Sequence, residues 1–86
     1  MNINNLIAIV KKKLTDSIVI EKIKIEDKSF LHKTHSGHQE GRFHLKIIIN
    51  SSELKNLSRI ESNKKIYKIL DQEMKEYIHS LQILIS

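Results

Sequence analysis

The stretch FHLKIIIN, residues 43–50, decides the fold of this chain. Its apolar residues Phe43, Leu45, Ile47 and Ile49 recur at every second position, which is the period at which side chains share one face of a β-strand. The run of isoleucines favours a strand further, because β-branched side chains suit a pleated surface. We therefore predict a strand with one face against a hydrophobic core.

An earlier stretch, SIVIEKIKIED at residues 17–27, predicts a partner for this strand. Ile23 and Ile25 fall on one face, and the other face carries charged residues, namely Lys22, Lys24 and Glu26. The segment between the two strands holds the only glycines of the chain, Gly37 and Gly41. Because consecutive strands usually pair, we predict an antiparallel hairpin with a long loop.

Helical spacing precedes this hairpin. In INNLIAIVKKKL, residues 3–14, the apolar residues form one stripe, made of Ile3, Leu6, Ile7, Val10 and Leu14. Three lysines, 11–13, would then lie in the last turn, where cations suit the helix dipole. The following LTDS, residues 14–17, predicts the end of the helix, because Thr, Asp and Ser favour local side-chain hydrogen bonds.

A second helix and a third strand follow the hairpin. In LSRIESNKKIYKILDQEM, residues 57–74, Ser58 is the predicted N-cap and Glu61 completes a capping box. A broad apolar face is predicted for this helix, made of Ile60, Ile66, Tyr67, Ile69, Leu70 and Met74. SLQILIS, residues 80–86, alternates as a short closing strand.

These elements predict one α+β domain over residues 1–86. The last strand adds to the hairpin, giving a mixed three-stranded sheet, and both helices cover the same face in a two-layer arrangement. The alternation of apolar and charged residues agrees with a sheet that is covered on one side only.

Composition narrows the function classes. The chain has no cysteine, so a metal site made by this chain alone would use His, Asp, Glu or backbone oxygens. A net charge of +5 is compatible with an anionic partner. No apolar run approaches the roughly 20 residues of a membrane-spanning helix, and the charges follow the first apolar stretch instead of preceding it as in a signal peptide. We therefore expect a cytoplasmic protein with no membrane contact.

Four of the five histidines fall in FLHKTHSGHQEGRFH, residues 30–44, and the fifth is His79. A solvated hairpin loop is the simplest interpretation, and metal binding by His32, His35 and His38 is the sharper one, because the glycines allow a loop to gather several side chains. His44 is predicted to be an exposed or half-buried strand residue. His79 lies at the predicted junction of helix and last strand, which can share an end of the sheet with the loop.

The second helix also carries a basic surface, made of Arg59, Lys64, Lys65 and Lys68. Such a surface is usually a solvated helix face, and its functional interpretation is contact with phosphate. Asp27, Glu40 and Glu53 fall in no recognisable catalytic spacing, so no enzymatic activity is predicted.

Several matches to a known family begin in the first strand. Asp27, Ser29 and His32 fit the family's pattern of an Asp, a Ser two residues on and a His three further. His32 and His35 fit the His-x-x-His of its longer-looped members.

The matches continue to the end of the chain. HLKIII from His44 fits the opening of the family's second strand, and IHSL, residues 78–81, fits its quartet of Ile or Val, His, Ala or Gly, and Leu. An ungapped match joins the two through Ser51, Leu54, Ser58, Tyr67, Leu70 and Met74. Over nearly its full length the chain therefore resembles the BolA family, in its histidine-loop type.

This resemblance implies the order helix, strand, strand, short helical turn, long helix, strand, related to class II KH domains. It also implies a non-enzymatic adaptor that pairs with a monothiol glutaredoxin and shares a bridging [2Fe-2S] cluster, in iron–sulfur metabolism or iron regulation. The partner and glutathione would supply thiolates, and this chain would supply His79 and a loop histidine, His32, with His35 and His38 as alternatives. The isolated chain would then be a monomer without a tightly bound cofactor, and a heterodimer with the glutaredoxin.

Two departures from the family pattern bear on function. Where most relatives have Phe-x-Gly-Lys, this chain has Leu54-Lys55-Asn56-Leu57, and we expect Asn56 to take the left-handed conformation of the glycine. Where they have Arg-His-Arg, this chain has Ser62-Asn63-Lys64. Some members are reported to bind promoter DNA through this region, so the loss of these side chains weakens the alternative of a DNA-binding transcriptional regulator. A third hypothesis is zinc or nickel chelation by the loop through His35 and His38.

Overall fold

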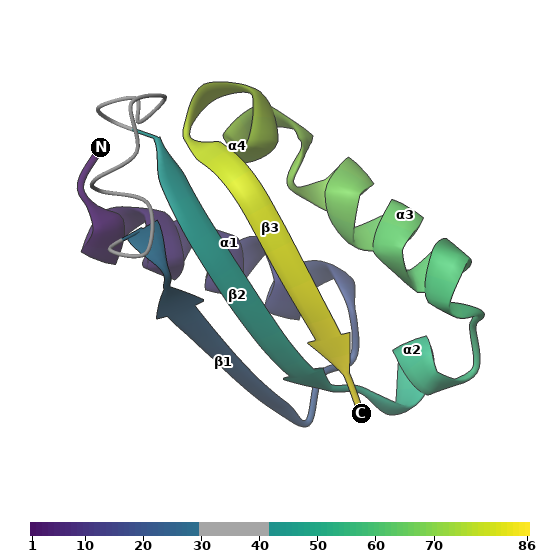
Figure 1. Ribbon diagram of the computed structural model, residues 1–86. Helices are drawn as coiled ribbons and strands as arrows, with labels where there is room; N and C mark the ends of the chain where they lie inside the picture. Colours follow the sequence, from purple (N-terminus) through teal and green to yellow (C-terminus); the bar gives the residue numbers. More distant parts are fainter. Residues whose placement is uncertain (30–41) are drawn as a thin grey trace.

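The computed structural model describes residues 1–29 and 42–86. Its elements in chain order are α1 (Ile3–Ser17), β1 (Lys22–Asp27), β2 (Phe43–Asn50), α2 (Ser52–Lys55), α3 (Arg59–Ile69), α4 (Asp71–Glu76) and β3 (Ile78–Ile85) (Figure 1). The predicted α+β fold, with three strands and a short helix before the long one, is confirmed. In the part of the chain that is described, no helix is both long and apolar enough to cross a membrane.

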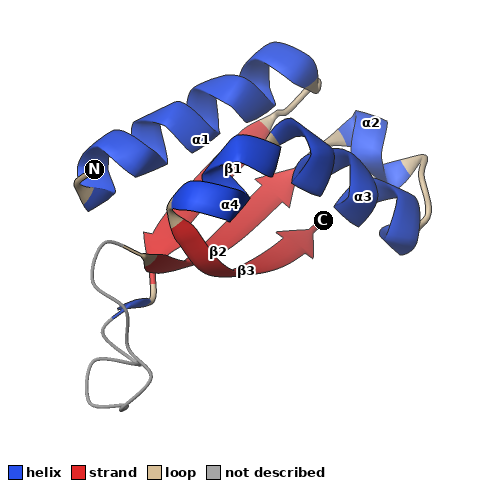
Figure 2. Cartoon of the chain, turned by 90° about the horizontal axis from the view of Figure 1, so that it is seen from above, coloured by secondary structure: helices blue, strands red, loops and turns tan. Residues whose placement is uncertain are grey.

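The sheet has the strand order β1-β2-β3, with β2 in the centre. β1 pairs antiparallel with β2, with Ile25 opposite Ile47, and β2 pairs parallel with β3, with Ile47 opposite Ile83. The parallel pairing requires a crossover, which the helices α2, α3 and α4 provide. All helices lie on one face of the sheet, as predicted, and no described element covers the opposite face (Figure 2).

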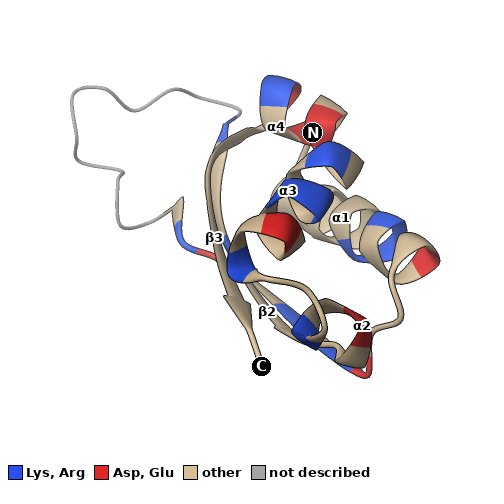
Figure 3. Cartoon of the chain, turned by 90° about the vertical axis from the view of Figure 1, so that its right-hand side faces the viewer, with Lys and Arg blue, Asp and Glu red and all other residues tan. Residues whose placement is uncertain are grey.

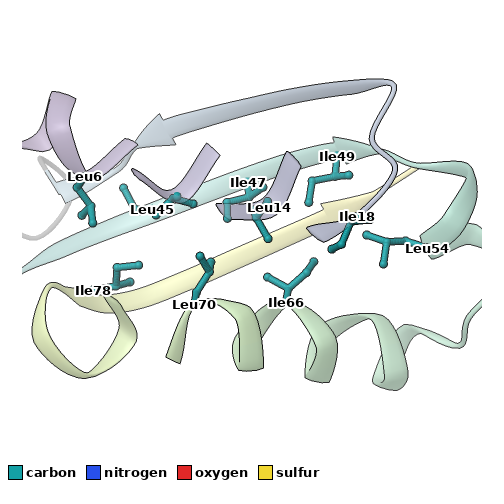
Figure 4. Close-up of a cluster of buried hydrophobic side chains, with 11 residues drawn as sticks. Leu6, Leu14, Ile18, Leu45, Ile47, Ile49, Leu54, Ile66, Leu70 and Ile78 are labelled. Atoms are coloured by element: carbon teal, nitrogen blue, oxygen red, sulfur yellow. The ribbon is translucent and has the colours of Figure 1, made fainter. Parts of the chain in front are cut away.

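The core lies between the sheet and the helices (Figure 4). The alternate residues Leu45, Ile47 and Ile49 of β2 are buried, as the two-residue period predicts. They face buried side chains from the helices and from the segments next to them, namely Leu6, Val10, Leu14, Ile18, Leu54, Ile66, Leu70 and Ile78. The central strand therefore anchors the hydrophobic core.

The predicted end of α1 is wrong. Asn2 caps the helix by accepting a hydrogen bond from the Asn5 N–H at 2.8 Å, and the helix continues through Thr15 to Ser17. The Thr15 hydroxyl donates to the Lys11 carbonyl at 2.9 Å, so it bonds within the helix instead of ending it. Burial of Leu14 and Ile18 in the core outweighs the weak helix propensity of this segment. The three lysines therefore lie in the middle of α1 and not in its last turn.

The predicted long helix is two helices. Ser58 is the N-cap of α3, as predicted: its hydroxyl accepts from the Glu61 N–H at 3.1 Å and donates to the Glu61 carboxylate at 3.0 Å. The helical conformation is interrupted at Leu70, whose φ of −97° and ψ of 19° depart from helical values, and α4 starts at the next residue. The break bends the chain so that α4 ends where β3 begins (Figure 1).

The predicted apolar face of α3 is partly wrong. Ile60 is 68% exposed and Tyr67 is 40% exposed, whereas Ser62 is buried beside Ile66. The buried residues Ser62, Ile66 and Leu70 are spaced four apart, so they form the stripe that meets the core. Ser62 tolerates burial because its hydroxyl donates to the Leu54 carbonyl at 3.0 Å.

The turn between α2 and α3 also differs from expectation. Asn56 has φ −83° and ψ −4°, a right-handed conformation, so the turn needs no residue of glycine type. Glu53 links this turn to its surroundings: it accepts from the Lys65 ammonium at 2.8 Å and from the Val19 N–H at 3.2 Å. The Lys65 hydrogen bond, followed by that of Val19, holds the pKa of the Glu53 carboxyl below its ordinary value.

The two isoleucines of opposite exposure in α3 give a matched test of the core. We expect Ile66→Ala to lower the free energy of unfolding by about 2–5 kcal/mol, because it leaves a cavity under the sheet. Ile60→Ala should change it by no more than about 0.5 kcal/mol. Urea unfolding followed by circular dichroism measures both changes. If Ile66→Ala does not fold, Ile66→Val takes its place, with an expected loss of about 0.5–1.5 kcal/mol in the free energy of unfolding. Equal losses for Ile66→Ala and Ile60→Ala would contradict this packing.

Candidate functional site

Two of the five histidines meet at one end of the sheet. His44 is the second residue of β2 and His79 the second residue of β3. Because β2 and β3 are parallel, both strands begin at the same end of the sheet (Figure 1). The imidazole ring centroids lie 4.9 Å apart, with the ring planes at 60°. The strand starts therefore form a pair of imidazoles in edge contact.

A β-bulge places His79 in this pair. Phe43 lies opposite Ile78 but His44 lies opposite Ser80, so β3 contributes one residue more than β2, and that residue is His79. A bulge of this kind changes the direction of a side chain and is common next to functional sites. The prediction that His79 lies at the junction of helix and strand is confirmed, since β3 begins one residue before it. Its side chain is exposed.

His44 is held more firmly than predicted. Its exposed fraction is only 9%, so the expectation of an exposed or half-buried side chain is wrong. The ring Nδ1 is in hydrogen-bond contact with the Ser80 hydroxyl, and the backbone N–H donates to the Ser29 hydroxyl at 3.1 Å. Hydrogen bonds to the backbone and to the ring thus fix both the position and the orientation of this imidazole.

The Ser29 hydroxyl is positioned in turn by Asp27. The Asp27 carboxylate accepts from the Ser29 N–H at 2.9 Å, which is the local hydrogen bond of an Asx turn. The His44 carbonyl accepts from the Lys28 N–H at 2.7 Å. The Asp-x-Ser pattern at the end of β1 therefore has a structural role, which is to bind the start of β2.

The other predicted metal ligands are not placed. His32, His35 and His38 lie in the segment 30–41, outside the described residues, so the loop chelation hypothesis lies there too. Within the described ranges no group of three or more His, Cys, Asp or Glu side chains is arranged to hold a metal ion. His44 is the residue that sequence reasoning left out of the site. The signal that would have found it is the parallel pairing, which brings the starts of both strands together.

The spacing of His44 and His79 suits shared coordination. Two imidazoles bound to one ion at metal–nitrogen distances of roughly 2.0–2.1 Å have ring centroids about 5 Å apart, and the observed separation is 4.9 Å. Two imidazoles are too few to complete a tetrahedral site, so further ligands would have to come from elsewhere. The described residues therefore supply at most two imidazole donors at this end of the sheet.

The predicted basic residues of α3 do not form one surface. Lys65 is engaged by Glu53 at 2.8 Å. Arg59 and Lys68 are nine positions apart, which places them on opposite sides of the helix. Lys64 and Lys68 share one face, are exposed and form no ion pair with a described residue. Acidic residues are interspersed with basic ones along the helices (Figure 3).

Comparison with known proteins agrees with the fold and with the sequence pattern. The family model of BolA-like proteins matches residues 14–86. The chain belongs to the BolA family. The DNA-binding transcriptional regulator BolA of Haemophilus influenzae is 28% identical over 75 residues, which cover 87% of this chain and 70% of that protein.

Solved structures support the same assignment at the level of the fold. The BolA domain of SufE1 from Arabidopsis thaliana superposes with a TM-score of 0.79 at 23% identity, covering 100% of this chain and 93% of that one. BolA1 from Arabidopsis thaliana superposes with a TM-score of 0.77 at 20% identity, covering 91% of this chain and 86% of that one.

The buried hydrogen bond between His44 and Ser29 can be tested by removing the hydroxyl. We expect Ser29→Ala to lower the free energy of unfolding by about 1–3 kcal/mol, because the His44 N–H loses its acceptor in a buried position. Amide hydrogen exchange at His44 should accelerate in the same variant. Ser17→Ala, at an exposed serine, serves as the control and should change the free energy of unfolding by no more than about 0.5 kcal/mol. Unchanged stability and exchange in Ser29→Ala would show that Ser29 does not hold the strand.

Proposed function

We propose that this chain binds a monothiol glutaredoxin and supplies imidazole ligands to a [2Fe-2S] cluster that the two proteins share. The observation that carries the proposal is the position of His79, which is exposed and projects from a bulge at the start of β3 beside His44. The absence of cysteine agrees with it, because the thiolates must then come from the partner and from glutathione. His32 is the first candidate for the second ligand, and His35 and His38 are the alternatives.

His44 gives the histidine pair its orientation. Its ring is fixed by Ser80 and its backbone by Ser29, and it packs edge-on against the His79 ring. A fixed neighbour restricts the rotation of His79 and so presents its nitrogen to the partner in a limited range of directions. His44 thereby acts as a positioning residue for His79, and its distance also makes it a candidate ligand. Imidazole ligation at one iron raises the potential of such a cluster relative to thiolate ligation.

The test is anaerobic cluster reconstitution on a monothiol glutaredoxin with glutathione, with and without this protein, followed by visible absorption and circular dichroism. We expect the spectrum to change when this protein is added and to return to that of the glutaredoxin alone with His79→Ala. His32→Ala should have the same effect, and Gln82→Ala, at an exposed position of β3, should have none.

Other outcomes of the reconstitution would change the assignment of the second ligand or contradict the proposal. If His32→Ala leaves the changed spectrum intact, the second ligand is one of the alternatives, which His35→Ala and His38→Ala test. If none of these loop variants changes the spectrum and His44→Ala abolishes it, the second ligand is His44. A spectrum that is indifferent to the wild-type protein, or that survives His79→Ala, contradicts the proposal. Size-exclusion chromatography of the same mixtures shows whether the two proteins associate without a cluster.

DNA binding is a second candidate, because the Haemophilus influenzae relative is named as a DNA-binding transcriptional regulator. The described contacts leave Lys64 and Lys68 as the two cations of α3 that share a face. If they bind phosphates, the logarithm of the affinity should fall with the logarithm of salt concentration with a slope of about −2. Lys64→Gln with Lys68→Gln should remove most of this slope, whereas Lys11→Gln on α1 should leave it unchanged. No binding to duplex DNA at low salt would exclude this candidate.

A further inference from the structure

A groove lies at the far end of β3 from His79. It has a volume of about 670 Å³ and runs between the turn that joins α2 to α3 and the last residues of β3. Its lining includes apolar side chains and two cations, namely Leu54, Leu57, Ile83, Ile85, Lys55 and Arg59. His79 and Ile85 are six positions apart, which corresponds to about 20 Å along a strand. The groove is therefore separate from the histidine pair.

One side of the groove is the free edge of the sheet. β3 is an edge strand, because its only described neighbour is β2. Both backbone groups of Ser86 face β2. Its N–H donates to the Ile49 carbonyl, and its C=O accepts from the Ser51 N–H. Since residues alternate along a strand, Ile83 and Ile85 direct their N–H and C=O groups away from β2. No described residue forms a hydrogen bond with these outward groups.

The contact of Tyr67 confirms the direction of this alternation. Its hydroxyl donates at 3.3 Å to the carbonyl of Leu81, the preceding residue of the outward set. Helix α3 therefore lies over the first part of the edge, and the part at Ile83 and Ile85 opens into the groove. An unpaired edge of this kind is a template for another strand.

Exposed apolar side chains lie near the free edge of β3. Two of the five large apolar side chains that are exposed in the described structure lie at this edge. These are Tyr67, whose hydroxyl donates to the Leu81 carbonyl, and Leu84, which lines the groove. Ile60 and Tyr67 are spaced seven residues apart and so share the face of α3 that looks toward the β3 edge. Gathered apolar side chains with polar neighbours are typical of sites that bind another macromolecule.

The charged side chains of the groove indicate what kind of partner it can bind. Lys55 and Arg59 are exposed and form no ion pair with any residue in the described ranges. None of the described residues that line the groove is acidic. Lys55 has an acidic neighbour in Glu21, since hydrogen bonds from Ser52 and, to a smaller extent, the charge of Lys55 lower the pKa of the Glu21 carboxyl. An occupant that carries carboxylates would therefore meet Arg59, and would compete with Glu21 for Lys55.

We propose that this groove binds an extended, acidic segment of a partner protein, which adds to the free edge of β3 as a fourth strand. The backbone of the segment pairs with Ile83 and Ile85, its apolar side chains enter the groove, and its carboxylates meet Lys55 and Arg59. The site is independent of the proposed glutaredoxin function, because it uses the opposite end of β3.

Two other occupants fit less well. A second copy of this chain would offer its own β3, IHSLQILIS at residues 78–86, which contains no acidic residue to neutralise Lys55 and Arg59. Single-stranded nucleic acid carries the right charge, but no aromatic side chain lines the groove to stack with bases. Both remain outcomes that the experiment distinguishes.

The experiment is a titration of the nitrogen-15-labelled protein with three probes, followed by amide chemical shifts. The probes are an octapeptide of alternating Val and Asp, the same peptide with Lys in place of Asp, and an oligothymidylate of eight nucleotides. We expect the acidic peptide to shift the amides of Ile83 and Ile85 and to slow their hydrogen exchange. The amides of His44 and His79 should not move, which separates this result from the glutaredoxin proposal.

Two variants test the contacts. Lys55→Glu with Arg59→Glu should weaken the binding of the acidic peptide by on the order of tenfold, and Lys11→Glu with Lys12→Glu on α1 should leave it unchanged. Glu at the first position of α3 suits the helix dipole, so the groove variant should fold. Ile85→Pro removes an outward N–H, keeps the bonds to β2 and should also weaken binding.

Four results of the titration would overturn the proposal. These are equal binding of the acidic and basic peptides, peptide binding that leaves the Ile83 and Ile85 amides unchanged, tighter binding of the oligothymidylate at the same amides, and no binding of the acidic peptide at millimolar concentration. Self-association through β3, seen as concentration-dependent shifts of the same amides without a probe, would assign the edge to a second copy and overturn it as well.

Discussion

The parallel pairing of β2 with β3 is the constraint on which the rest of the structure depends. A parallel neighbour cannot be reached by a tight turn, so the chain must cross over through α2, α3 and α4, and these helices cover one face of the sheet together with α1 (Figure 2). The same pairing brings the starts of both strands to one end, which is why His44 and His79 meet. It also leaves β3 as an edge strand. Core, histidine pair and groove thus follow from one pairing.

The histidine pair depends on a small network of polar groups. Asp27 positions Ser29, Ser29 accepts from the His44 N–H, and Ser80 contacts the ring. A buried N–H is costly when it has no acceptor, so this network fixes the start of β2 to the end of β1. The Ser80 hydroxyl, at the start of β3, supplies the contact to the His44 ring. The orientation of the His44 ring therefore depends on residues from β3 and from the end of β1.

The sequence predicted the elements where one signal was strong and missed those set by tertiary packing. Two-residue alternation was sufficient for β1 and β2, and the family quartet was sufficient to place His79. The end of α1 was missed because core packing of Ile18 outweighs local propensity. Ile60 was assigned to the core and Ser62 was not, because α3 carries apolar residues around much of its circumference and hydrophobicity alone does not select the buried stripe. The bulge at His79 has no signature in the alternation, so the contact with His44 required the strand register.

The two ends of β3 differ in their relation to the family. At the start of the strand this chain keeps the family's histidine, and the structure adds a second one beside it. At the other end the groove is lined by residues from the two stretches that depart from the family pattern, including Lys55, Leu57 and Asn63. Ser62 and Asn63, where the family pattern has Arg and His, both line the groove, and Ser62 is buried, so this part of the groove is apolar and polar with little positive charge. A surface of this kind disfavours a polyphosphate backbone and favours a polypeptide with a few carboxylates. The two proposed sites therefore lie at opposite ends of one strand and share no residue.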